Sequence, residues 1–312
     1  MYDMAYPDNT LYIIGNGFDC HHNVKSSYKE LSDWLKHNNS SLYQQLNEIC
    51  EADYLWSEFE RALPHISRST FAGAELFLPD VVDDDTLVAD ISMAGDWARS
   101  MGESLWSDIE LWFRKWVDSI RTPRDYDKYK IMLDYDARFI NFNYTTFLES
   151  QYGIDTEQIL YIHGCQASRK NPPIIGHSGE DTFNRWYRSN SHFHKLYKNE
   201  ELPEYDMLTS GIEEYYGLSE KPVSKIIVKY SSFFEDLYDI KHVYVLGHSM
   251  AAVDLPYIRQ IILYNEYPDD IKWHFSYYND KEQIQLKRII QKMTNRQVNY
   301  EFFKMKDLQL PY

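Results

Sequence analysis

The chain has 312 residues, of which 44% are hydrophobic and 16% are aromatic, and its formal net charge at pH 7 is −16. This length holds one large domain or two modest ones, and the apolar content excludes a largely disordered chain. The acidic net charge argues against non-specific binding to nucleic acid, because binding to phosphates depends on Lys and Arg.

Short apolar runs bounded by glycine or polar residues predict buried strands. In chain order they are 11–15, 137–144, 158–164, 172–176, 242–247, 271–278 and 299–304. Helical patterns separate several of them, and such alternation indicates an α/β fold. We expect a Rossmann-like, mostly parallel sheet that is flanked by helices and carries a helical insertion.

The helical patterns predict amphipathic helices in 26–38, 41–66, 93–120, 223–240, 253–265 and 280–295. Residues 26–130 contain only such patterns, and they are too many for a plain crossover between strands. We therefore predict a nucleotide-binding domain from residues 1–25 and 131–312, with 26–130 as an inserted helical layer. Residues 180–220 favour a second insertion or a lid, and the acidic run 80–90 is typical of a solvated loop.

The turns that follow the strands are the candidate sites, because open α/β sheets bind ligands at the carboxyl ends of their strands. Gly15 and Gly17 form a Gly-x-Gly turn after the first strand, which lets backbone approach a ligand closely. A purely structural turn would have the same sequence. Asp19 could hold ribose hydroxyls, or it could cap the next turn.

Asn143 and His163 end two later strands. Asn143 could orient a water or a ribose hydroxyl while staying neutral, or it could bond to backbone as a turn residue. His163 could act as a base near neutral pH, and a half-buried structural histidine is the alternative. His177 repeats this pattern more weakly.

The stretch LGHSMA, residues 246–251, nearly matches the G-x-S-x-G turn of α/β-hydrolases. In that fold the acid and the histidine follow the serine, but only His274 follows Ser249, inside a predicted strand. A serine hydrolase is therefore disfavoured. Asp254 either caps the next helix or reaches a ribose.

Six motifs in this order resemble the AbiH family of bacterial phage abortive-infection proteins. They are YIIGNGFDCHHNVKSSY, LWSEFERAL, FNYTTFLE, YIHG, IIGHS and VYVLGHSMAAVDLPYI, from residue 11 to about 260. The resemblance implies anti-phage defence, in which infection triggers damage to the host cell's own resources and phage spread stops. It does not by itself supply the chemistry.

A more distant resemblance, to sirtuins and sirtuin-like NAD hydrolases, concerns the turns GNG, FNYT, IHG and GHSMAAVD, which come in the same order at strand ends. It implies that Asn143 orients the ribose or the attacking water and that His163 is the base. It also implies that Gly15 and Gly17 cradle the pyrophosphate and that Gly247 and Ser249 contact the nucleotide. From the same two turns we add Asn16, Asp19 and Asp254 to these nucleotide contacts.

This chain departs from the sirtuin pattern in two of those turns. Thr145 replaces the acid after Asn143, and Asn16 replaces alanine. The missing acid leaves open whether NAD is the substrate. The chain also lacks the Cys-x-x-Cys zinc pair that deacylases usually have after the His-Gly turn, which favours hydrolysis. We expect no metal and no cofactor beyond the nucleotide.

Three functions follow from these observations. The first is cleavage of NAD or a related nucleotide at the N-glycosidic bond, and the second is nucleotide sensing that acts through a partner protein. The third is a nuclease with His163, His177 and Asp19 in hydrolytic roles, which the acidic charge disfavours. Expected partners are the nucleotide, a phage-derived trigger or an operon partner protein, and further copies of the chain.

The remaining signals concern the compartment. Cys20, Cys50 and Cys165 are too few and too scattered for a disulfide framework, which favours a reducing compartment. The sequence has no run of eighteen apolar residues, and its first residues lack the basic and apolar pattern of a signal peptide, so we expect neither a membrane span nor a signal peptide. We expect a cytoplasmic protein with no membrane contact.

Overall fold

The computed structural model describes residues 9–67, 70, 84–124, 126–179, 213–293 and 297–309. The chain divides into two units. Unit 1 consists of residues 1–27, 117–174 and 222–312, and unit 2 consists of residues 28–116 and 175–221. The predicted lid at 180–220 lies outside the described residues as far as residue 212.

Unit 1 holds a six-stranded parallel sheet, which confirms the predicted α/β class and its Rossmann-like arrangement. The strand order is β3-β2-β1-β4-β5-β6. The strands are β1 (Thr10–Ile14), β2 (Arg138–Asn141), β3 (Ile159–Tyr161), β4 (His242–Leu246), β5 (Lys272–Ser276) and β6 (Asn299–Phe303). Because the order reverses between β1 and β4, the switch point where such sheets bind ligands lies there.

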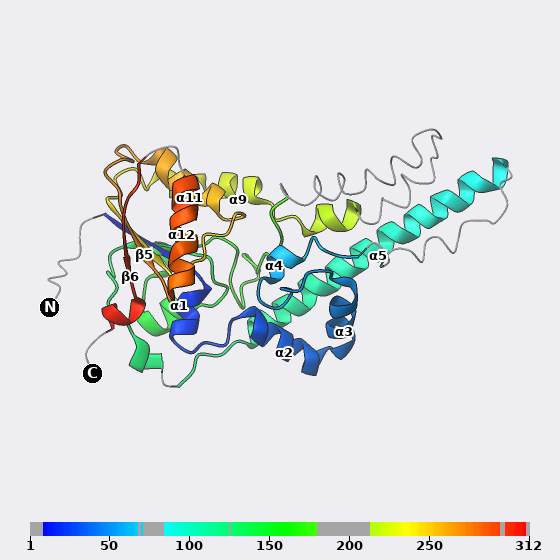
Figure 1. Ribbon diagram of the computed structural model, residues 1–312, viewed down its shortest axis with the longest axis horizontal. Helices are drawn as coiled ribbons and strands as arrows, with labels where there is room; N and C mark the ends of the chain where they lie inside the picture. Colours follow the sequence, from blue (N-terminus) through cyan, green and yellow to red (C-terminus); the bar gives the residue numbers. More distant parts are fainter. Residues whose placement is uncertain are drawn as a thin grey trace. The chain divides into compact units, whose positions relative to one another are not determined.

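Four helices pack their apolar side chains on one face of this sheet. They are α9 (Val223–Lys229), α10 (Ser231–Glu235), α11 (Leu255–Tyr264) and α12 (Asp280–Met293), and Figure 1 shows the last two beside β5 and β6. Strand residues Val243, Trp273 and Phe275 meet Tyr257 and Ile290 in one buried core. Burying such side chains contributes roughly 1.5–3 kcal/mol each.

The predicted strand at 172–176 is wrong, because these residues form no regular structure. Pro172 and Pro173 have no backbone N–H to donate to a ladder. Ile174 donates its N–H to the carbonyl of His163 at 2.8 Å instead. The segment therefore follows the end of β3 as an extended loop.

Short helices lie in the connections of unit 1. They are α1 (Asn16–His21), η2 (Tyr126–Tyr129), η3 (Leu148–Tyr152), η4 (Thr156–Gln158) and η5 (Met305–Leu308). His22 fastens α1, because one ring nitrogen donates to the Phe18 carbonyl at 2.8 Å and the other accepts from the Tyr152 hydroxyl at 2.7 Å. Burial lowers the pKa of His22 to about 4, so the ring is neutral in this role.

Unit 2 contains α2 (Tyr28–Asn38), α3 (Ser40–Ile49) and α4 (Phe59–Ala62), and most of α5 (Asp84–Ser119). The continuous helical pattern predicted for 41–66 is wrong. The chain leaves the helix at Cys50 and forms an antiparallel bridge with Ile66. The predicted loop at 80–90 is also wrong from residue 84 onward, where α5 begins.

None of the described helices combines the length and the apolar character that crossing a bilayer requires. Cys20, Cys50 and Cys165 all lie in described segments, and none forms a disulfide.

Candidate functional site

The turns after β1 and β4 meet backbone to backbone at the switch point. Gly17 donates its N–H to the carbonyl of Gly247 at 2.8 Å. A Cβ atom on Gly15 would lie 2.4 Å from the Cα of His248, and one on Gly17 would lie 2.8 Å from the Cα of Gly247. Gly247 itself has φ +62, a left-handed conformation that favours glycine. These three glycines therefore allow two ligand-edge turns to touch.

This contact bears on the expected nucleotide contacts in the first turn. The backbone of the β4 turn occupies the space beside Gly15 and Gly17, and it uses the N–H of Gly17. Asn16 accepts a hydrogen bond from the Ser26 hydroxyl at 2.5 Å through its side-chain oxygen. A pyrophosphate contact by these residues stays a prediction.

Asp19 joins the turn after β1 to the turn after β2. Its side chain is buried, and its two oxygens accept hydrogen bonds from Asn143 Nδ2 at 2.8 Å and Thr145 Oγ1 at 2.6 Å. Burial raises the pKa of Asp19 to about 6, and the hydrogen bonds from Thr145 and Asn143 partly oppose that rise. Both oxygens of Asp19 thus bind side chains of the chain itself.

The amide of Asn143 is held in one orientation by this contact. Its Nδ2 donates to Asp19, and its backbone N–H donates to the side-chain oxygen of Asn141 at 2.9 Å. Its Oδ1 is buried and accepts no hydrogen bond from the described residues. A buried acceptor without a donor is costly, and it is satisfied when a ligand hydroxyl or a water donates to it.

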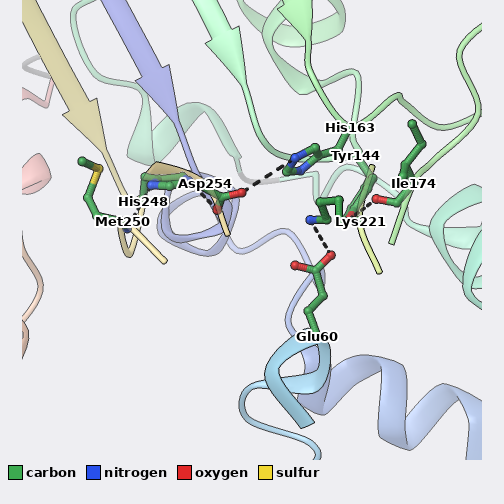
Figure 2. Close-up of polar contacts among 8 residues, drawn as sticks. All are labelled: Glu60, Tyr144, His163, Ile174, Lys221, His248, Met250 and Asp254. Atoms are coloured by element: carbon green, nitrogen blue, oxygen red, sulfur yellow. Dashed lines mark hydrogen bonds and ion pairs between the residues drawn. The ribbon is translucent and has the colours of Figure 1, made fainter. Parts of the chain in front are cut away.

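His163 and His248 both face the carboxylate of Asp254, and all three residues are more than 90% buried. Figure 2 shows this His–Asp–His cluster. Asp254 Oδ2 lies 3.3 Å from His248 Nε2, and Oδ1 lies 3.7 Å from His163 Nε2. Both distances exceed the usual hydrogen-bond range of about 2.7–3.2 Å, and either contact is an ion pair only when its histidine ring is protonated.

Asp254 lies at the N-cap position of α11, but its side chain makes no capping hydrogen bond. The predicted side-chain cap is therefore wrong. The carboxylate turns toward the two histidines instead.

Aromatic rings enclose the histidines of the cluster. Phe142 lies 4.3 Å from the ring of His248 and 5.4 Å from the ring of His163, centroid to centroid. The ring of Tyr257 also lies 5.5 Å from the ring of His163. Tyr144 donates its hydroxyl to the Ile174 carbonyl at 3.0 Å, which fastens the loop after His163 (Figure 2).

Ser249 is exposed, whereas its neighbours His248 and Met250 are buried. His274 lies in β5 as expected, and its ring nitrogens contact Glu301 at 2.7 Å and His242 at 3.1 Å. Ser249 therefore has no acid–base pair from the histidine that follows it. A nucleotide contact by Ser249 stays a prediction.

His177 belongs to unit 2, whereas His163 belongs to unit 1. It is buried, and its backbone pairs with Ser219 and Lys221 at 2.9 Å each. Burial lowers the pKa of His177. In the same unit the buried ammonium of Lys221 forms an ion pair with Glu60 at 2.9 Å (Figure 2).

A surface hollow of about 680 Å³ lies at the opposite edge of the sheet, where β6 begins. It is lined by Asp269, Gln297, Val298, Asn299 and Tyr300. Ligands of open α/β sheets bind at the carboxyl edge, so the His–Asp–His cluster is the better candidate site. Within the described part of the chain, no group of three or more His, Cys, Asp or Glu residues is arranged to hold a metal ion.

The sequence did not single out two residues that lie in the candidate site at the carboxyl edge of the sheet. His248 occupies the variable position of G-x-S, and Thr145 stands out in the sequence only as the loss of an acid. Both are polar residues within two positions of a candidate residue in a strand-end turn, and that position was the available signal.

The fold and the His–Asp–His cluster define a Rossmann-like α/β protein with a candidate site at the switch point of its sheet. Among known protein families, the one described as Bacteriophage abortive infection AbiH matches residues 11–277. The chain therefore belongs to the AbiH family, and its role is in phage abortive infection. No curated protein and no solved structure gives a significant match.

Proposed function

We propose that this AbiH protein stops infection by cleaving NAD or a related nucleotide at the N-glycosidic bond. The observation that carries the proposal is the buried Oδ1 of Asn143, which lacks a donor among the described residues at the edge where such sheets bind nucleotides. A ribose hydroxyl or an attacking water supplies that donor. The distant sirtuin-like resemblance of the four turns supports the same reading.

His163 is the base in this reaction. The neutral ring that keeps its proton on Nε2, toward Asp254, has its lone pair on Nδ1. The carboxylate stabilises the charge that the ring gains when Nδ1 accepts a proton. A positioned base of this kind contributes about 10²–10⁴-fold.

The step balances with water as the co-reactant. The oxygen of water bonds to C1′ of the ribose while the bond from C1′ to the nicotinamide nitrogen breaks, and that electron pair neutralises the pyridinium. The proton of water passes to His163. Asn143 holds the ribose or the water in line, and such positioning can supply roughly 7–11 kcal/mol.

Steady loss of NAD would kill the cell, so the activity must be repressed until infection. In the cell a partner protein would hold the enzyme inactive until a phage-derived trigger releases it, so the purified chain without that partner is active. The enzyme works in the host cytoplasm, where NAD is available, and it needs no metal in this mechanism.

Mass spectrometry of nucleotides incubated with the purified full chain tests the proposal. We expect nicotinamide and ADP-ribose from the wild type, and rates lower by about 10²–10⁴-fold for His163→Ala. Asn143→Ala should also lose activity. The exposed residues His37 and Asn47 provide matched controls, His37→Ala and Asn47→Ala, which should stay active.

Two outcomes contradict the proposal. If His163→Ala consumes NAD as fast as the wild type, the assigned base is wrong. If the wild type binds a nucleotide and leaves it intact, the protein is a sensor that acts through a partner.

A further inference from the structure

The turn after β4 contains a backbone conformation that its sequence does not favour. Met250 has φ +55, in the left-handed region that side chains other than glycine rarely adopt. Such conformations persist only where surrounding contacts hold them, and they often mark functional turns. In this turn the Met250 N–H donates a hydrogen bond of 3.0 Å to Nδ1 of His248.

This hydrogen bond determines where His248 carries its proton. A backbone N–H can only donate, so Nδ1 of His248 must accept, and the neutral ring then carries its proton on Nε2. Nε2 lies 3.3 Å from Oδ2 of Asp254. With its proton on Nε2, the ring of His248 faces the carboxylate with a donor, at a distance longer than a normal hydrogen bond.

The start of α11 does not use the carboxylate of Asp254 as a cap. An N-cap side chain accepts from the N–H of the second or third helical residue. Pro256 is the second residue and has no N–H. Tyr257 is the third, and its N–H donates to the backbone carbonyl of Asp254 at 3.1 Å. Neither donor of the cap is available to the side chain.

We propose that His248 is a positioning residue that holds one oxygen of Asp254 so that the other oxygen faces His163. This inference rests on the proposed function, in which His163 is the base. His248 does not touch the substrate, and its effect reaches the reaction through Asp254. The turn 247–254 is therefore built to aim a carboxylate rather than to present Ser249.

Two amide substitutions separate the contact of His248 with Met250 from its contact with Asp254. His248→Asn places an acceptor near the position of Nδ1 and keeps the Met250 contact, but it is too short to reach Asp254. His248→Gln reaches Asp254 with an N–H donor and loses the Met250 contact. Each variant therefore removes one of the two contacts.

The first measurement is the ¹⁵N spectrum of the His163 ring in the full-length protein without nucleotide. We expect the ring shifts of His163 to change in His248→Asn and to stay near those of the wild type in His248→Gln. The second measurement is kinetic. We expect kcat to fall about tenfold in His248→Asn at unchanged KM, and to recover in His248→Gln.

The reverse pattern overturns the inference, because it would mean that only the folding of the turn matters. Unchanged His163 shifts in both variants overturn it as well. If His248→Asn does not fold, His248→Met replaces it, since Met has the reach of Gln and no donor. A wild type that cleaves no nucleotide refutes the proposed function alone, because the spectra still decide the role of His248.

Discussion

Replacing Asp19 by asparagine should make the protein more stable at neutral pH than the wild type. The substitution keeps the shape of the side chain and the acceptor for Asn143. The hydroxyl of Thr145 now donates to Asp19 at 2.6 Å, and it can rotate to accept from the new amide. The exchange therefore removes a buried charge and leaves both contacts satisfied.

The size of the effect follows from the pKa of Asp19, which burial raises from its ordinary 3.8 to about 6. A raised folded-state pKa means that the unfolded chain loses its proton first. Asp19 then contributes its full stability below about pH 4 and loses that contribution as the pH rises through about 6. A difference of about two pKa units corresponds to about 3 kcal/mol.

Urea unfolding from about pH 4 to about pH 8 measures this dependence. We expect Asp19→Asn to become more stable relative to the wild type as the pH rises, with the difference in free energy of unfolding growing by about 3 kcal/mol across this range. Asp33→Asn, at an exposed position of α2, is the control and should follow the wild type. If instead the wild type becomes more stable relative to Asp19→Asn as the pH rises, the fold stabilises Asp19 as an anion and the reasoning is refuted.

Two further changes test the packing of each unit. Gly17→Ala should cost about 1–3 kcal/mol in thermal or urea unfolding, because the added Cβ lies 2.8 Å from the backbone of Gly247; Gly217→Ala, which meets open space, is its control, and equal stabilities would contradict the close approach. Glu60→Gln should cost about 3 kcal/mol, because the ammonium of Lys221 is buried beside Glu60. Adding Lys221→Met should recover much of that loss, and a double variant less stable than Glu60→Gln would contradict the ion-pair account.

The sequence by itself determined the elements of the sheet and the family. Buried strands are continuous apolar runs bounded by turn residues, so β1 to β5 could be read from local composition alone. The run at 299–304 also forms a strand, but its predicted burial is wrong, because most residues of β6 are exposed. The strand predicted at 172–176 does not form, because its two prolines have no backbone N–H to donate to a neighbouring strand. The six motifs between residue 11 and about 260 were enough to indicate AbiH, which the family match over residues 11–277 confirms.

Only the tertiary structure decided which partners the polar side chains take. Local patterns predict periodic packing, but Asp19 meets Asn143 and Thr145 across more than 120 residues of chain. Whether the side chain of Asp254 caps α11 or faces the histidines depended on which backbone N–H groups at the start of α11 already had acceptors. A pattern of residue types does not contain that information. A carboxylate binds the donors that the backbone leaves within reach, and that reach is set by the pairing of β1 with β2 and β4.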